Sequence, residues 1–175
     1  MKSISMALLA LGLFASSAVR AADPLPRGWM LGGKGYEAGL DQQTKHGGSA
    51  SAFLRRNGGG DEFGTLMQMI DATAYRGVRL RLTGYSRAVE VAGWAGFWLR
   101  VDGPAGVLAF DNMQSRPIRG TKEWKRDEIV LDVPPEAKAL AFGVLLAGGG
   151  QVWVDDLRLE TVGQDVAVTA PGQTR

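Results

Sequence analysis

The chain has 175 residues, no cysteine, one histidine and a formal net charge of +2. A chain without cysteine has no disulfide framework and no lipid-modified cysteine anchor, and a single histidine excludes a metal centre built from clustered histidines. The length suits one domain with a single core.

The N-terminus has the three parts of an export signal. Lys2 precedes an apolar stretch from Ile4 to Ala15, and the residues that follow include the small Ser16, Ser17, Ala18 and Ala21. This order is typical of a cleaved signal peptide, and the apolar run is short for a membrane span. We expect residues 1–21 to be removed, the mature protein to be periplasmic or secreted, and no membrane insertion after cleavage. An uncleaved membrane anchor is the alternative.

Removal of residues 1–21 changes the charge balance. That segment holds two basic residues, Lys2 and Arg20, and no acidic one, so the 20 basic and 18 acidic residues of the chain become 18 of each. A formally neutral domain lacks the basic surface that binds nucleic acid. We therefore expect no nucleic-acid partner.

The mature chain consists of short apolar or alternating runs separated by glycine clusters, a pattern typical of a β-sandwich or barrel. Residues 22–27 contain two prolines and form an extended lead-in, and 28–162 form one domain. After residue 162 the pattern is lost, which predicts a flexible tail over 163–175. The expected strands, in chain order, are 28–31, 36–41, 49–56, 64–72, 78–86, 96–102, 106–113, 125–133, 139–146 and 151–160.

Three local patterns add detail. From Val78 to Thr83 apolar and polar residues alternate, which predicts a strand with one buried and one solvated face. Between Val152 and Leu159 the apolar face changes parity across two aspartates, which predicts a bulge. Glycine clusters at 58–61 and 148–150 predict hairpin connections with unusual backbone angles.

Two further segments carry a resemblance to a known fold. Thr44–Ser51 (TKHGGSAS) is similar to an early turn, and Gln151–Leu157 (QVWVDDL) to the closing strand, of galactose-binding-like domains of the carbohydrate-binding-module type. The resemblance covers residues 28–162. It implies an all-β jelly-roll β-sandwich of two antiparallel sheets, and a module that binds a ligand without catalysis.

A closer resemblance is to small uncharacterised bacterial domains, some of which are labelled transcriptional regulators. It is carried by the segments 63–68 (FGTLMQ), 93–103 (GWAGFWLRVDG), 108–113 (LAFDNM) and 116–121 (RPIRGT). The regulator label disagrees with this chain, which has an export signal and no helix-turn-helix pattern.

The segment 97–102 supplies the candidate ligand site. If Phe97 and Leu99 fill the core, then Trp98 and Arg100 face the other way. Such a concave face suits a glycan or similar polar small molecule, because rings stack on sugar C–H groups while amides and guanidinium bind hydroxyls. The candidate ligand-binding residues are Gln68, Trp98, Arg100 and Asn112, with Trp94, Gln114, Arg116 and Trp124 at the edge.

A plainer interpretation of the same residues stays open. The five tryptophans of the chain can fill the core, and Arg100 with Asp102 can form a surface ion pair of little energetic weight. The protein is then an envelope protein-interaction or structural module without a small-molecule site.

The sequence gives little support to catalysis. Without cysteine, a nucleophile with a histidine base has to use His46, which precedes two glycines and fits a turn. The neighbouring carboxylates at 127–128 and 155–156 point to opposite faces of a strand. We expect no enzyme activity, unless two carboxylates face each other, or His46 lies within hydrogen-bond reach of one, inside a cleft.

No cofactor is required, but the resemblance implies a structural calcium ion as one use of the carboxylates. Glu37 or Asp41, carbonyls near residue 47, and Asp155 or Asp156 would supply the oxygen ligands. The alternative is that Asp155 accepts hydrogen bonds from backbone amides at the bulge.

Overall fold

The computed structural model describes residues 25–170. The expected signal peptide (1–21), residues 22–24 of the lead-in and residues 171–175 of the tail lie outside this range. Within it the chain forms strands joined by turns, and one 3₁₀ turn, η1, at Thr73–Tyr75. The strands are β1 Trp29–Gly32, β2 Tyr36–Asp41, β3 Ser51–Arg56, β4 Phe63–Asp71, β5 Arg79–Gly103, β6 Gly106–Asp111, β7 Ile118–Asp132, β8 Ala139–Ala147 and β9 Gln151–Val162.

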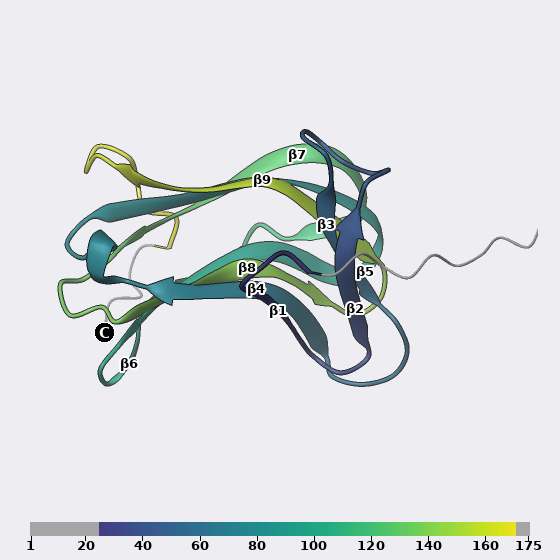
Figure 1. Cartoon of the computed structure of the whole chain (residues 1–175), viewed down its shortest axis with the longest axis horizontal. Coiled ribbons are helices and arrows are strands. Elements are labelled where there is room, and N and C mark those ends of the chain that lie inside the picture. Colours follow the sequence, from purple (N-terminus) through teal and green to yellow (C-terminus); the bar gives the residue numbers. More distant parts are fainter. Residues whose placement is uncertain (1–24, 171–175) are drawn as a thin grey trace, which may run out of the picture.

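The strands form two antiparallel layers that share β5 (Figure 1). The lower sheet has the order β1-β4-β8-β5-β6, and the upper sheet the order β2-β3-β9-β5 with β7 on the other side of β5. The described residues therefore form an all-β sandwich, as predicted. In residues 25–170 no helix has the length and apolar character needed to cross a membrane.

Strand β5 passes from one layer to the other. Its first part, 79–89, pairs with β9, and its last part, 94–103, pairs with β8. The sequence predicted two strands here, with residues 87–95 outside both. The alternation fails in 87–95 because the pairing with β7 shifts three times between Ser86 and Ala95, and each bulge changes which face a residue occupies.

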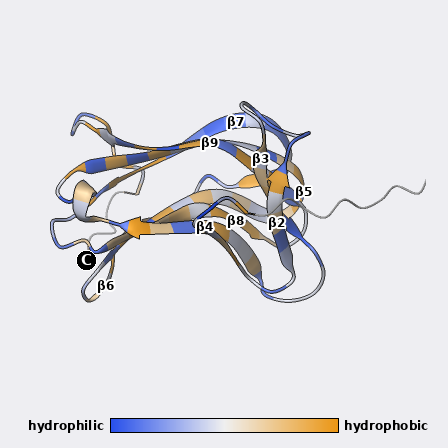
Figure 2. Ribbon diagram, in the orientation of Figure 1, coloured by the Kyte–Doolittle hydropathy of each residue, from blue (hydrophilic) through white to orange (hydrophobic). Residues whose placement is uncertain are grey.

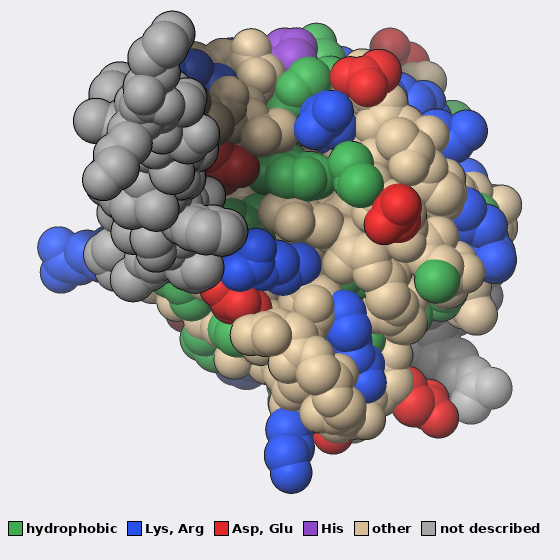
Figure 3. All heavy atoms as spheres, turned by 90° about the vertical axis from the view of Figure 1, so that its right-hand side faces the viewer, with side chains coloured by type: hydrophobic (Ala, Val, Ile, Leu, Met, Phe, Trp, Pro, Cys, Tyr) green, Lys and Arg blue, Asp and Glu red, His purple; other side chains and the backbone are tan. Residues whose placement is uncertain are grey.

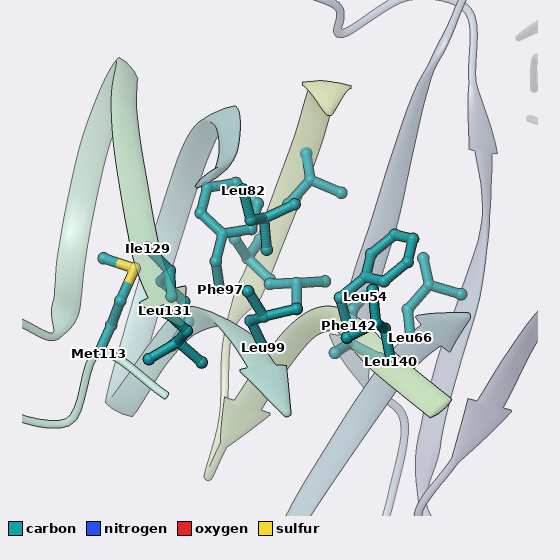
Figure 4. Packing of buried hydrophobic residues seen from close by; sticks show 14 of the residues in the cluster. Leu54, Leu66, Leu82, Phe97, Leu99, Met113, Ile129, Leu131, Leu140 and Phe142 are labelled. Atoms are coloured by element: carbon teal, nitrogen blue, oxygen red, sulfur yellow. The ribbon is translucent and has the colours of Figure 1, made fainter. Parts of the chain in front are cut away.

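The core lies between the two layers (Figure 4). Leu82 from the upper part of β5 and Phe97 and Leu99 from its lower part are each at most 1% exposed. They pack with residues of β4, β7 and β8. Figure 2 shows the matching alternation of hydrophobic and hydrophilic residues along the strands. Arg79 and Arg81, which alternate with Leu80 and Leu82, remain partly exposed, as the pattern predicted.

The predicted bulge is present in β9. Tyr85 pairs with Asp155 and Thr83 with Arg158, so β9 has one more residue than β5 over this interval. Asp156 takes up the difference with a φ of 52°, a left-handed conformation that Asp tolerates better than most residues.

The glycine connections differ in part from the prediction. Gly58 and Gly148 have φ values of 110° and 79°, so the unusual backbone angles are confirmed. The hairpins are not: these turns join β3 to β4 and β8 to β9, which lie in different sheets. A tight glycine turn is suited to either task, and the sequence does not distinguish them.

Residues 163–170, assigned above to a flexible tail, make hydrogen bonds to the sandwich. Arg79 Nη1 donates to the carbonyls of Gln164 and Val166 at 2.9 and 2.7 Å. Thr169 Oγ1 donates to Asp111 at 2.6 Å, and the Thr169 amide donates to the carbonyl of Val130. These bonds attach this part of the tail to β5, β6 and β7.

We predict that Phe97→Ala lowers the free energy of unfolding by about 3–5 kcal/mol, because it opens a cavity between the sheets. Urea unfolding followed by tryptophan fluorescence measures the change. The control, Val107→Ala, alters a side chain that is 53% exposed and should cost less than about 0.5 kcal/mol. Equal effects of the two substitutions would contradict the described core.

Candidate functional site

A hollow of about 500 Å³ lies on the outer face of the lower sheet. We call it the aromatic hollow, since most of its wall is made of aromatic and apolar side chains. Its lining residues come from the β3–β4 connection and from β4, β5, β8 and the β6 region: Glu62, Phe63, Thr65, Met67, Trp94, Trp98, Arg100, Phe110, Asn112, Leu145 and Ala147.

The alternation along β5 places its tryptophans and arginine in this wall. Phe97 and Leu99 face the core and are at most 1% exposed. Trp98 belongs instead to a separate cluster with Ala141 and Leu145 on the outer face, and Arg100 lines the same hollow. The predicted parity of the segment 97–101 is therefore confirmed.

Small residues beside the large rings create the depression. Trp98 lies opposite Gly143 on β8, and Trp94 lies opposite Ala147. Directly paired residues of antiparallel strands point to the same face, so each ring has a small neighbour. Gly96, between the two tryptophans on this face, cannot be enlarged without a clash: a Cβ there would lie 2.9 Å from the Asn112 carbonyl oxygen.

Trp98 forms the floor of the hollow. Its side chain is only 7% exposed, and its indole Nε1 donates a hydrogen bond to Thr65 Oγ1 at 2.9 Å. Thr65 in turn donates to the Val144 carbonyl at 3.0 Å. The polar edge of the ring is thus satisfied within the protein, and the ring is held in one orientation. Trp94 is more exposed and forms part of the wall.

Arg100 is held by its neighbour two residues along the strand. Arg100 Nη2 donates to Asp102 Oδ2 at 3.0 Å, and Nε lies 2.8 Å from Oδ1 of the same carboxylate. The surface ion pair of the alternative interpretation is thus present, yet the guanidinium also lines the hollow. The pair fixes the guanidinium and neutralises its charge, which suits hydroxyl ligands better than anions.

Of the predicted ligand residues, Trp94, Trp98, Arg100 and Asn112 share the aromatic hollow. Gln114 lies in an adjoining polar hollow of about 540 Å³, which shares Phe110 and Asn112 with the first.

Gln68, Arg116 and Trp124 lie elsewhere. Gln68 pairs with Phe142 of the core cluster, so its side chain points to the inner face of β4, and Met67 lines the hollow instead. Arg116 binds Asp111. Trp124 lies on β7 in the upper sheet, with its ring 5.8 Å from that of His46.

The face of β4 was misjudged because both of its faces carry apolar residues. Alternation along β4 places Gln68 on the face opposite to Met67 and Met69, but it does not show which of the two faces lies against the core. The pairing register with β8 decides which face of β4 lies against the core, and the alternation along a single strand does not reveal that register. Phe110 had a usable signal, since it shares parity with Asn112. The other lining residues that sequence reasoning missed are Glu62, Phe63, Thr65, Met67, Leu145 and Ala147.

Asp111 stabilises the segment next to the hollow. Its carboxylate, 6% exposed, accepts hydrogen bonds from Arg116, from Thr169 and from the Met113 amide. Burial raises the pKa of Asp111, but these hydrogen bonds and the charge of Arg116 outweigh burial and hold the pKa below its usual value. The ionised carboxylate therefore stabilises the folded state.

The four carboxylates proposed for calcium have protein partners. Glu37 pairs with Arg55 at 2.9 Å. Asp41 accepts from the indole Nε1 of Trp153 at 2.8 Å and from the Gln43 and Thr44 amides. Burial raises the pKa of Asp41, and these hydrogen bonds lower it to a net value below the usual one.

The other two carboxylates hold the turn that contains His46. Asp155 Oδ2 accepts from the backbone amides of His46 and Gly47 at 2.9 and 3.0 Å. Its Oδ1 accepts from the Asp156 amide at the bulge at 2.8 Å, which is the alternative role expected for it. Asp156 Oδ2 lies 2.9 Å from His46 Nδ1. Among residues 25–170, no group of three or more His, Asp or Glu side chains is arranged to hold a metal ion. Calcium binding stays a prediction.

Charged side chains of both signs occur together over the surface. Figure 3 shows lysines, arginines and acidic residues interspersed on the end of the sandwich near β2 and β3. Many form pairs, such as Arg55 with Glu37 and Arg87 with Glu123.

No protein-family model matches the chain. A curated protein, the uncharacterized HTH-type transcriptional regulator YbfP of Bacillus subtilis (strain 168), is 43% identical over 149 residues. The match covers 82% of this chain and 50% of that protein, so the chain spans about half the length of the curated relative. The relative's label matches the resemblance stated from the sequence.

Solved structures of similar fold include the CBM22-1 xylan-binding domain of Paenibacillus barcinonensis Xyn10C. It has a TM-score of 0.58 at 12% identity, over 81% of this chain and 89% of that domain. The chain has the jelly-roll fold of that domain. The Stig cyclase Fisc from Fischerella sp. TAU has the same architecture, with a TM-score of 0.56 at 15% identity, over 85% of this chain and 92% of that one.

The jelly roll itself does not decide between binding and catalysis, because proteins of both kinds share it. Within residues 25–170 its only helical element is the three-residue turn η1, so this part of the chain contains no helix-turn-helix. The function has to be argued from the hollow.

We predict that Asp111→Asn destabilises the jelly roll at neutral pH and that the loss shrinks in acid. A lowered native pKa means that the Asp111 contribution is complete above the unfolded value of about 3.9 and disappears as pH falls through the native pKa. Urea unfolding at several pH values measures both proteins. The control is Glu136→Gln, at an exposed position; a pH-independent difference for Asp111→Asn would contradict the described electrostatics.

Proposed function

We propose that this jelly roll is a non-catalytic module that binds a carbohydrate in the aromatic hollow. The observation that carries the proposal is the convergence of Trp94, Trp98 and Phe110 with Arg100 and Asn112 in one open depression. The xylan-binding neighbour of the same fold gives independent support for this ligand class.

The chemistry of the wall fits a neutral sugar chain. Aromatic faces stack on the C–H faces of sugar rings. This contact depends little on how the hydroxyl groups of the sugar are arranged. Asn112 and the guanidinium of Arg100 provide hydrogen bonds to hydroxyl groups. A cleft with few polar groups in an apolar wall is typical of ligand sites.

The composition of the hollow also supports binding without catalysis. Its ionisable lining residues are Glu62 and Arg100, so it offers one carboxylate, whereas glycoside hydrolysis commonly uses two facing ones. His46 does lie within hydrogen-bond reach of Asp156, which is the condition set above for the enzyme alternative. Both residues line a separate hollow on the upper-sheet side of the sandwich, away from the aromatic hollow.

We also propose that the protein works in the periplasm or outside the cell. The support is the N-terminal pattern of Lys2, an apolar stretch and small residues before position 22. A glycan ligand is consistent with that location.

We predict that xylan oligosaccharides or another neutral glycan in a broad panel raise the melting temperature in a dose-dependent way. A ligand at a hundred times its Kd stabilises the folded state by about 2.7 kcal/mol. Trp94→Ala should weaken binding by about tenfold or more, because it removes a stacking surface. Differential scanning fluorimetry and isothermal titration calorimetry measure these effects.

Trp124→Ala is the matched control for that experiment. It also removes a partly exposed tryptophan, but from the upper sheet, so glycan affinity should stay unchanged. If Trp124→Ala weakens binding and Trp94→Ala does not, the ligand binds elsewhere and the proposal is wrong.

A protein-interaction module is the second candidate, and one observation favours it. Met30, Phe63 and Met69 are 50%, 54% and 48% exposed on the outer face of the lower sheet, around the aromatic hollow. Exposed apolar side chains grouped on one face are typical of partner surfaces. Absence of a thermal shift with every glycan of the panel would favour this candidate.

A further inference from the structure

A third hollow lies on the outer face of the upper sheet, on the opposite side of the sandwich from the aromatic hollow. It measures about 380 Å³ and is lined by residues of β5, β7, β9 and the turn that contains His46. Arg81 and Thr83 point into it from β5, because Leu80 and Leu82 face the core. We call it the arginine hollow, since Arg126 and Arg158 also line it.

The lining of the arginine hollow holds three arginines and two carboxylates, those of Asp156 and Glu160. Arg81 Nη2 donates to Glu160 at 3.1 Å, and Arg126 lies 3.5 Å from Glu128. Arg158 makes no hydrogen bond or ion pair with any residue in the range 25–170. One guanidinium in the hollow therefore has no acceptor from the described chain.

Arg81 carries a further donor without an acceptor, in addition to the Arg158 guanidinium. Its Nε is buried and has no hydrogen-bond partner within the described residues. A buried cationic donor without an acceptor costs free energy, and it keeps positive charge at the wall of the hollow. The Arg81 and Arg158 side chains line the same hollow from adjacent strands.

One wall of the arginine hollow is aromatic and held firmly in place. The rings of His46 and Tyr85 stack with centroids 3.6 Å apart and an angle of 14° between planes. His46 Nδ1 lies 2.9 Å from Asp156 Oδ2, and the His46 amide donates to Asp155. These contacts fix the wall before any ligand arrives, which lowers the entropic cost of binding.

We propose that the arginine hollow binds a ligand through an oxyanion, which Arg158 and Arg81 hold by charge-assisted hydrogen bonds. The guanidinium fork matches the oxygen spacing of carboxylate, phosphate and sulfate groups. A sugar acid and a phosphoryl or sulfuryl group share this chemistry. The inference is independent of the aromatic hollow, where Arg100 is already paired with Asp102.

His46 provides a local reporter for the test, because it is the single histidine of the chain. Its ring signals are followed by ¹H–¹³C NMR in full-length protein made without a histidine tag. Glucuronate, inorganic phosphate and glucose are titrated separately at fixed pH and fixed ionic strength. These conditions separate ligand binding from protonation of the ring and from general screening.

We expect saturable shifts of the His46 signals with glucuronate, phosphate or both, and none with glucose. A response to glucuronate alone identifies a sugar carboxylate as the ligand group, and a response to phosphate alone identifies a tetrahedral oxyanion. Arg158→Gln should weaken the binding by about tenfold or more. Arg119→Gln removes an exposed arginine outside the hollow and should leave it unchanged.

Three results would overturn the inference: no saturable response to either oxyanion, an equal response to glucose, or equal weakening by the two substitutions. Circular dichroism of both variants checks that they fold. Because the titrants and the reporter differ from those used for the aromatic hollow, failure here leaves the proposed glycan site intact, and the reverse also holds.

Discussion

The alternation of side chains along the second half of β5 is the constraint on which the site depends. Phe97 and Leu99 fill the space between the sheets, and the geometry of a strand then forces Trp98 and Arg100 to the outer face. A slip of one residue in register would exchange the two sets and place a guanidinium in the core. Burial of the core residues therefore fixes the position of the aromatic ones.

The outer faces of the two sheets differ in character, because different residues of β5 point outward in each sheet. On the lower sheet, small residues such as Gly143 lie beside the Trp98 ring and leave a depression with an apolar wall. On the upper sheet, the residues of β5 that alternate with the core are Arg81 and Thr83, and the surface there is polar. One strand thus supplies a hydrophobic site to one face of the molecule and a cationic hollow to the other.

Features that depend on alternation within a single strand were predicted from the sequence, and features that depend on the pairing of two strands were not. The parity of Trp98 and Arg100 and the bulge at Asp155–Asp156 are local properties, and both are confirmed. The positions of Gln68 and Trp124 follow from pairing between strands far apart in the chain, and alternation within one strand carries no information about it. The crossing of β5 between sheets was missed because its bulges interrupt the pattern in residues 87–95.

The central claim is that a glycan contacts the outer face of the lower sheet, and the five tryptophans of the chain make it directly measurable. Each indole N–H gives its own NMR signal, and xylan oligosaccharides are added to ¹⁵N-labelled protein. The account predicts that the signals of Trp94 and Trp98 shift on saturation while those of Trp124 and Trp153 stay in place. Shifts confined to Trp124 and Trp153, on the upper sheet, would contradict it.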